Sequence, residues 1–176
     1  MEKWIQIAKE CGFTHAAPLD PATLMPRQAV REMCAQDKCR VYGKNWSCPP
    51  YCGTLDECGH KIRSYSKGIL LQTVGSLEKT VDTKGYARVE RLHMEAFHKF
   101  CDNLRQQYPA ALCLGSGGCR ICGECAWPAP CRFPERACPS MEGYGLFVTQ
   151  VCRDNAMEYY HGPKTITYTA CVLFGK

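Results

Sequence analysis

Three cysteines at two-residue gaps constrain this chain more than any other feature of its sequence. Cys119, Cys122 and Cys125 lie in the run GGCRICGEC. The C-x2-C-x2-C spacing places three thiolates on one tight loop, where they can bind three irons of a [4Fe–4S] cluster. Structural zinc sites usually take two cysteines from each of two separated segments. The spacing therefore favours an iron–sulfur cluster, with zinc as the alternative.

Two later cysteines are candidates for the fourth ligand of this group. In two-cluster bacterial ferredoxins the next cysteine follows after three residues, precedes a proline and binds the other cluster. Here Cys131 follows Cys125 after five residues, whereas Cys138 lies farther along and precedes Pro139. Cys131 is the nearer candidate, and Cys138 is the alternative.

A second group of cysteines precedes this motif. It comprises Cys34, Cys39, Cys48, Cys52 and Cys58, which gives five candidates for four ligand positions. Their spacing matches no ferredoxin pattern, but the two prolines after Cys48 stiffen the chain beside a candidate ligand. Free cysteines are usually small core residues, and five of them fit poorly in such a polar segment. The group favours a second [4Fe–4S] cluster over zinc.

The rest of the composition indicates the redox state of these thiols. Fifteen cysteines in 176 residues is a share typical of either a disulfide scaffold or a metal-loaded protein. The first residues, MEKWIQIAKECGF, show no secretory signal, and the longest apolar runs, ILLQTV and TACVLF, are too short to span a membrane. The number of cysteines is also odd. We therefore expect a cytoplasmic protein without membrane association, whose thiols stay reduced.

The net charge gives little support for nucleic-acid binding. The formal charge is +5 at pH 7, but the basic residues are scattered and form no long run. Ligating thiols are deprotonated, so eight of them around two cubane cores would bring the net charge to roughly +1. We therefore expect no nucleic-acid partner.

Hydrophobic periodicity predicts three helices. The first covers residues 2–10, and the longest covers residues 85–108, where apolar residues recur at steps of three and four. Between them, a helix at 25–33 would have Pro26 in its first turn and would deliver Cys34 at its C-terminal end.

Buried apolar runs predict strands at 68–75, 110–115, 145–152 and 165–175, with a short helical piece at 154–162 between the last two. The first two strands and the helix between them are suited to a right-handed parallel crossover. The motif cysteines follow the C-terminal end of the second of these strands, where open α/β sheets usually place their sites.

Together these elements predict one α/β domain over residues 1–176. It would contain a small mixed sheet of about four strands, packed helices, and two cysteine-rich metal-binding loops at about 34–60 and 115–140. The first loop is turn-rich over its whole length. So long an irregular segment is uncommon in a compact domain unless something such as a metal organises it.

Other residues have simpler expected roles. Five cysteines in predicted helices, strands or their ends are expected to be small core residues: Cys11, Cys101, Cys113, Cys152 and Cys171. Trp46, Tyr51 and Trp127 flank the ligand candidates and would shield a cluster from water, although simple packing explains them equally well. Glu142 follows Ser140 near a predicted helix start, where a carboxylate stabilises the helix dipole.

Three segments carry a resemblance to a known family: CRVYGKNWSCPPYCGTLDEC, CRICGECAWPAPCRFPERACPSMEGYG and TITYTACVLF. Over nearly its whole length the chain resembles the domain of unknown function 2284 family of predicted metal-binding proteins. By position, the resemblance implies a first ligand set of Cys34, Cys39, Cys48 and Cys58, and a second of Cys119, Cys122, Cys125 and Cys131. Cys52 and Cys138 lie outside these sets. The family implies metal binding and no particular reaction.

Three functions are compatible with this sequence. The leading hypothesis is an iron–sulfur protein with two [4Fe–4S] clusters that transfers electrons to a redox partner protein in a reducing or anaerobic cytoplasm, since no flavin or nicotinamide motif is present. A second is an enzyme in which an iron without a cysteine ligand binds a small substrate as a Lewis acid. A third is a zinc-stabilised interaction module. The sequence identifies no catalytic residue and no oligomeric state.

Overall fold

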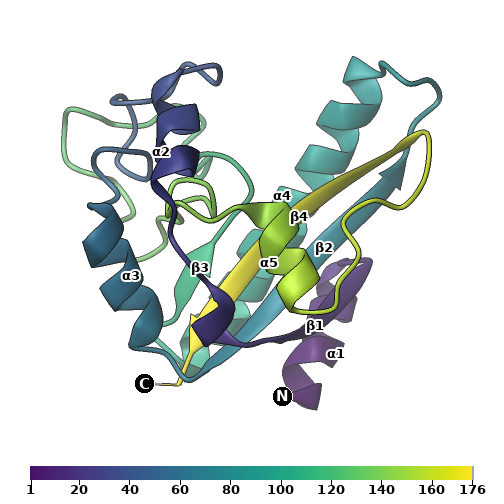
Figure 1. Ribbon diagram of the computed structural model, residues 1–176, viewed down its shortest axis with the longest axis horizontal. Coiled ribbons are helices and arrows are strands. Elements are labelled where there is room, and N and C mark those ends of the chain that lie inside the picture. Colours follow the sequence, from purple (N-terminus) through teal and green to yellow (C-terminus); the bar gives the residue numbers. More distant parts are fainter. Residues whose placement is uncertain (176) are drawn as a thin grey trace.

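A four-stranded antiparallel sheet forms the centre of the structure, a computed structural model that describes residues 1–175 (Figure 1). Its strands are β1 (His15–Leu19), β2 (Lys67–Ser76), β3 (Leu112–Leu114) and β4 (Thr165–Phe174). The helices are α1 (Glu2–Cys11), α2 (Gln28–Ala35), α3 (Leu55–Arg63), α4 (Thr83–Gln107) and α5 (Val148–Asp154), with a short 3-10 helix at Pro21–Thr23. The predicted α/β class, with about four strands and packed helices, is confirmed.

The strand order is β1-β2-β4-β3, and each neighbouring pair is antiparallel. Cys171 of β4 lies opposite Leu70 of β2 on one side and opposite Leu114 of β3 on the other. Strands β2 and β3 therefore run in the same direction, as the predicted crossover requires, but they are not neighbours. The longer strand β4 lies between them. All ten residues of β2 pair with β4, whereas the short β3 pairs only with the buried C-terminal end of β4.

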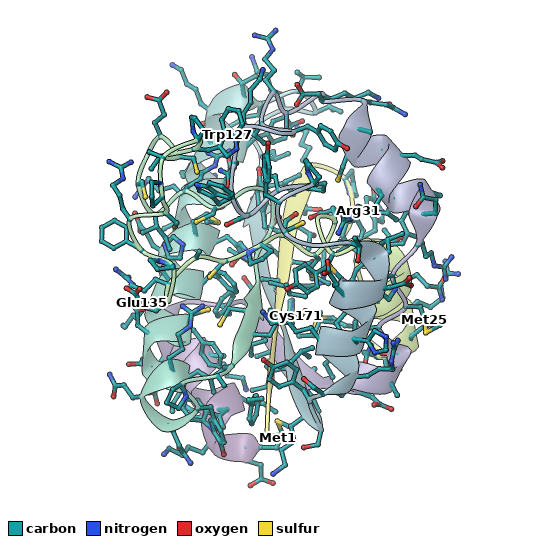
Figure 2. The ribbon with its side chains drawn as sticks, turned by 90° about the vertical axis from the view of Figure 1, so that its left-hand side faces the viewer. Met1, Met25, Arg31, Trp127, Glu135 and Cys171 are labelled. Atoms are coloured by element: carbon teal, nitrogen blue, oxygen red, sulfur yellow. The ribbon has the colours of Figure 1, made fainter. Side chains whose placement is uncertain are left out.

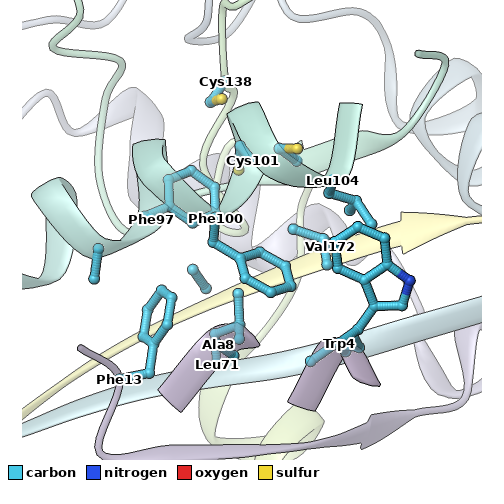
Figure 3. Packing of buried hydrophobic residues seen from close by; sticks show 14 of the residues in the cluster. Trp4, Ala8, Phe13, Leu71, Phe97, Phe100, Cys101, Leu104, Cys138 and Val172 are labelled. Carbon is cyan, nitrogen blue, oxygen red and sulfur yellow. The ribbon is translucent and has the colours of Figure 1, made fainter. Parts of the chain in front are cut away.

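Alternating side chains divide the sheet between two hydrophobic cores. Ile69, Leu71 and Val172 face one core, whereas Leu70 and Leu173 face the other. Helices α1 and α4 cover the first face, where Phe100 of α4 packs against Trp4 of α1 and against Phe13 (Figure 3). Helices α3 and α5 and the segment 141–146 cover the second face. Both faces of the sheet are therefore buried.

Helix α3 begins inside the segment at about 34–60 that was predicted to be turn-rich, and it extends beyond the end of that segment. Its start is a capping box: the Thr54 hydroxyl accepts a hydrogen bond from the Glu57 N–H at 3.2 Å, and the Glu57 carboxylate accepts one from the Thr54 N–H at 2.7 Å. These two bonds satisfy exposed N–H groups of the first turn. Ile62 then anchors the helix in the second core.

Three predicted elements differ from the structure. Residues 145–152 were expected to form a strand, but α5 begins at Val148, and its buried residues Val151 and Cys152 are adjacent rather than alternating. The β-branched residues of this segment misled the prediction, because β propensity depends on context. A short helical piece was expected at 154–162, but of these residues only Asp154 is helical, as the last residue of α5. The helix expected at 25–33 instead begins at Gln28, although it does deliver Cys34 to its last turn.

Strand β1 was not predicted. Its sequence, HAAPL, contains two alanines and a proline, which are poor strand formers. The strand forms because it lies at the edge of the sheet, where Pro18 is opposite Ile69 of β2 and one missing N–H is tolerated.

A buried histidine in the first core gives a pH-dependence prediction. His93 of α4 is fully buried, its Nδ1 lies 3.0 Å from the Thr73 hydroxyl, and burial lowers its pKa to about 4. This pKa lies below the value near 6.5 that histidine has in the unfolded chain. The contribution of neutral His93 to the free energy of unfolding is therefore fully present above pH 6.5 and is lost as the pH falls toward 4. Between pH 7 and pH 4.5 the native protein should lose about 2–3 kcal/mol through this group.

Urea unfolding at these two pH values, for the native chain and for His93→Leu, measures this contribution. The substitution removes the titrating group, so its loss of stability between pH 7 and pH 4.5 should be smaller by that amount. Equal losses in the two proteins would show that His93 does not titrate in this range.

The two cysteine-rich loops lie together at one end of the sheet, away from both the N and C ends of the chain (Figure 1). The side view agrees, with Trp127 of the second loop at the opposite end from Met1 (Figure 2). The first loop extends from α2, and the second follows β3 and returns to α5.

Candidate metal centre

Backbone and aromatic contacts join the two loops. The Asn45 amide donates a hydrogen bond to the Cys119 carbonyl at 3.4 Å, and the Trp46 indole N–H donates to the Ala129 carbonyl at 2.8 Å. The Tyr51 ring lies between those of Trp46 and Trp127, at centroid distances of 5.1 and 5.7 Å. The cysteines of both loops are therefore brought to one region of the molecule.

All four cysteines of the second predicted set line one pocket: Cys119, Cys122, Cys125 and Cys131. Each is half-buried. Asn45, Trp46 and Ser47 of the first loop complete the wall. The predicted alternative ligand, Cys138, does not line this pocket and lies in the first hydrophobic core, where it is only 3% exposed. The geometry thus groups Cys131, and not Cys138, with the three motif cysteines.

Three cysteines of the first predicted set line a second pocket of about 280 Å³: Cys34, Cys39 and Cys48. Val30, Met33 and Val41 supply apolar walls, and Ser140 and Glu142 supply oxygen atoms. Burial and the neighbouring thiols of Cys39, Cys34, Cys119 and Cys125 raise the pKa of Cys48 to about 12. Since these neighbours come from both sets, Cys48 lies between the two pockets.

The fourth cysteine of the first predicted set is elsewhere. Cys58, on α3, is 1% exposed in the second core, and its sulfur accepts a hydrogen bond from the Arg31 guanidinium at 3.3 Å. Hydrogen bonding with Cys52, together with Arg31, lowers the pKa of Cys58 to about 7, although burial opposes this shift. The Cys52 thiol in turn donates to the Gly143 carbonyl at 3.3 Å. Cys52 and Cys58 thus form a thiol pair outside the second pocket.

A third group of thiols lies in the first core. The prediction that Cys101 and Cys113 are core residues is confirmed, and Cys138, the predicted alternative ligand, lies with them. Cys101 of α4, Cys113 of β3 and Cys138 are all buried, and each thiol affects the pKa of the other two. The Arg105 guanidinium also donates to the Cys138 sulfur at 3.6 Å. The hydrogen bonds from the two thiols, and then Arg105, lower the pKa of Cys138 to about 3. The Cys138 sulfur also lies 3.2 Å from the Arg136 carbonyl oxygen.

The other cysteines predicted to be core residues follow that prediction in part. Cys152 and Cys171 are buried in the second core. Cys11 is half-buried at the end of α1, where it packs against the first core. All fifteen cysteines of the chain are free thiols.

Glu142 has surroundings that the sequence did not indicate. No helix starts at Ser140, whose hydroxyl accepts a hydrogen bond from the Gly143 N–H at 2.8 Å within a turn. The Oε2 atom of Glu142 is buried and has no hydrogen-bond partner. Burial raises the pKa of this carboxyl group. The only sequence signal for this position was a carboxylate close to a cysteine-rich loop.

Two arginines beside the motif are held by oxygen atoms of the protein. Arg120 forms an ion pair with Glu90 of α4 at 2.7 Å, and Arg132 donates to the Glu124 carbonyl at 2.6 Å. These contacts tie the second loop to α4 and to itself.

Among residues 1–175, no three His, Cys, Asp or Glu side chains form a group that could hold a single metal ion. Over the same part of the chain, no helix has the length and apolarity needed to cross a membrane.

Comparison with known proteins agrees with this concentration of thiols. A family model described as "Predicted metal-binding protein (DUF2284)" matches residues 17–174, which include both cysteine-rich loops and both pockets. No curated protein and no solved structure matches the chain. The match covers nearly the whole sequence and confirms the resemblance carried by the cysteine segments. The chain therefore belongs to the DUF2284 family of predicted metal-binding proteins.

Proposed function

We propose that this metal-binding protein carries two [4Fe–4S] clusters and transfers electrons to a partner protein. The observation that carries the proposal is the convergence of Cys119, Cys122, Cys125 and Cys131 on one pocket. Thiolates are the usual ligands of [4Fe–4S] clusters, and three of these four have the two-residue spacing typical of cluster loops. Once bound, a cluster would supply one-electron redox chemistry, while these cysteines would hold it and keep it from solvent.

The second pocket supports a second cluster. Cys34, Cys39 and Cys48 line it, and Cys48 interacts with thiols of both sets. Two clusters held on either side of Cys48 would be close neighbours, and close spacing favours electron transfer between them. Soft thiolate donors select iron–sulfur clusters or zinc over harder metals. A reducing cytoplasm suits this function, since all fifteen cysteines are free thiols.

The protein surroundings would tune the potential of such clusters. Solvent exposure and hydrogen bonds near the sulfurs are the main protein influences on this potential. The rings of Trp46, Tyr51 and Trp127 form a continuous aromatic cover across the junction of the two loops. This cover would limit the access of water and oxygen to the pocket of Cys119, Cys122, Cys125 and Cys131, which Trp46 also lines.

One observation favours an enzyme as the second candidate function. Only three cysteines line the pocket of about 280 Å³, because Cys58 is paired with Arg31 outside it. A cluster bound there would have one iron without a cysteine ligand. Such an iron can act as a Lewis acid toward a small molecule in the same pocket.

Metal analysis of anaerobically purified protein tests the proposal. The chain should carry about eight irons and about eight sulfides, as two [4Fe–4S] clusters require. The protein should be brown, and its visible absorption should bleach on reduction with dithionite. A colourless protein that contains only zinc would contradict the proposal and would favour a zinc-stabilised interaction module.

A further inference from the structure

We infer that Glu142, and not Cys58, supplies the fourth protein ligand of the metal centre in the second pocket, beside Cys34, Cys39 and Cys48. The inference rests on the proposed function, because it assigns the ligands of one of the two proposed clusters. It would give that centre three sulfur donors and one oxygen donor.

The positions of the side chains are the first argument. Glu142 and the three cysteines line the same pocket and come from three separate parts of the chain: the end of α2, the loop after it, and the turn that precedes α5. The thiol of Cys34 lies 3.7 Å from the Glu142 backbone carbonyl, so the turn that carries the carboxylate is in direct contact with a candidate ligand.

The unpartnered oxygen is the second argument. The Ser140 hydroxyl and the Gly117 backbone N–H lie near the Glu142 carboxyl group, in the lining of the same pocket. Its Oε2 atom nevertheless remains buried without a partner. A buried carboxylate oxygen without a partner is costly, and a cation beside it removes that cost. None of the ion pairs formed by residues 1–175 includes Glu142. A metal centre held by the neighbouring thiols would supply the missing positive charge.

The environment of Cys58 is the third argument. Its sulfur is already hydrogen-bonded to Arg31 and to Cys52, and it is almost completely buried in the second core. Arg31 also donates to the Gly53 carbonyl at 2.7 Å, which fixes the guanidinium beside the sulfur. Ligation by Cys58 would require this arrangement to open. Glu142 requires no such change, because it already lines the pocket.

An oxygen ligand would make one iron of the cluster different from the other three. Carboxylates are harder donors than thiolates and bind iron of a cluster less tightly. That iron would therefore exchange more readily and would be the position at which a small molecule with an oxygen donor binds. The inference thus gives the second candidate function a defined site.

The experiment compares iron content and electron paramagnetic resonance for four anaerobically purified proteins: the native chain, Glu142→Ala, Cys58→Ala and Glu135→Ala. Glu135 is an exposed carboxylate in the second cysteine loop and serves as the matched control. One equivalent of ferricyanide is then added. It removes one electron from a [4Fe–4S]2+ cluster whose iron is weakly held, which yields [3Fe–4S]+ and one free Fe2+.

The native chain, Cys58→Ala and Glu135→Ala should each carry about eight irons, whereas Glu142→Ala should carry about seven, because loss of one Fe2+ leaves a reduced [3Fe–4S]0 cluster. Ferricyanide should then oxidise this cluster to [3Fe–4S]+ and produce the three-iron signal without releasing a further Fe2+. Glu142→Cys should restore about eight irons and resist ferricyanide, because a thiolate then replaces the oxygen. If Cys58→Ala fails to fold, Cys58→Val keeps the site apolar and allows the same comparison.

The opposite pattern would overturn the inference. If the Cys58 variants lose about four irons while Glu142→Ala keeps about eight, Cys58 is the ligand, and the proposed function stands. If the native chain itself contains no iron, the proposed function fails, and the inference fails with it. The two failures are therefore distinguishable in the same samples.

Discussion

Cys131→Ser is expected to lose about four of eight irons, together with about four sulfides, whereas Cys138→Ser should keep all of them. Cys131 lines the same pocket as Cys119, Cys122 and Cys125, so its loss removes one of four ligands. Cys138 lies instead in the first core, hydrogen-bonded to other thiols and to Arg105. Iron and sulfide analysis of anaerobically purified variants, with visible absorption of equal protein concentrations, measures the difference.

The two substitutions are well matched, since each exchanges one sulfur for oxygen within seven residues of the other. Thermal unfolding of both variants shows whether a loss of iron reflects a loss of fold. Cys138→Ser is expected to be the less stable of the two, because it weakens a buried hydrogen-bond network. Loss of iron from Cys138→Ser alone would contradict the assignment of Cys131 to the cluster pocket.

Phe100→Ala should lower the free energy of unfolding by about 3–5 kcal/mol, the usual cost of truncating a buried phenylalanine. The Phe100 ring is fully buried, and its centroid lies 6.0 Å from that of Trp4 and 6.3 Å from that of Phe13. The substitution would leave a cavity between α4, α1 and the sheet, which the surrounding rings can fill only in part. Urea unfolding at pH 7 measures the loss through the shift in midpoint.

Leu92→Ala is the control for this prediction. Leu92 lies on the same helix but is 44% exposed, so the cost should stay within about 1 kcal/mol. Phe100 lines neither cysteine pocket, and Phe100→Ala should therefore keep the native iron content at low temperature. A similar cost for both variants would mean that the contact of α4 with α1 contributes little to stability.

The elements that were predicted well are those with strong periodicity. The long helix α4 and the strands β2 and β4 carry continuous apolar patterns, and their predicted bounds are within two residues of those observed. Strand β1 was missed because its residues have low strand propensity, and its pairing with β2 is what stabilises it. The capping box that begins α3 was visible in the run TLDE, but the surrounding turn residues outweighed it.

The sequence located both cysteine loops but could not sort their ligands. Cys52 is closer to Cys48 in the sequence than Cys39 is, and Cys58 is only one residue farther away than Cys39, yet of these three only Cys39 shares the pocket of Cys48. The spacing of cysteines along a loop does not determine which of them line the same pocket, because a helix such as α3 can carry one of them into the core. The contact of Glu142 with the same pocket depends on the turn before α5, which carries no recognisable motif.

The position of β4 also has a consequence for how the protein is made. This strand joins β2 to β3, yet it follows both cysteine loops in the sequence. A ribosome therefore releases every candidate ligand before the strand that completes the sheet. Until β4 inserts, β3 has no partner strand in the sheet. We expect delivery of metal to be a late step of biogenesis, after translation has passed β4, and to depend on a cellular environment that protects bare thiols in the interval.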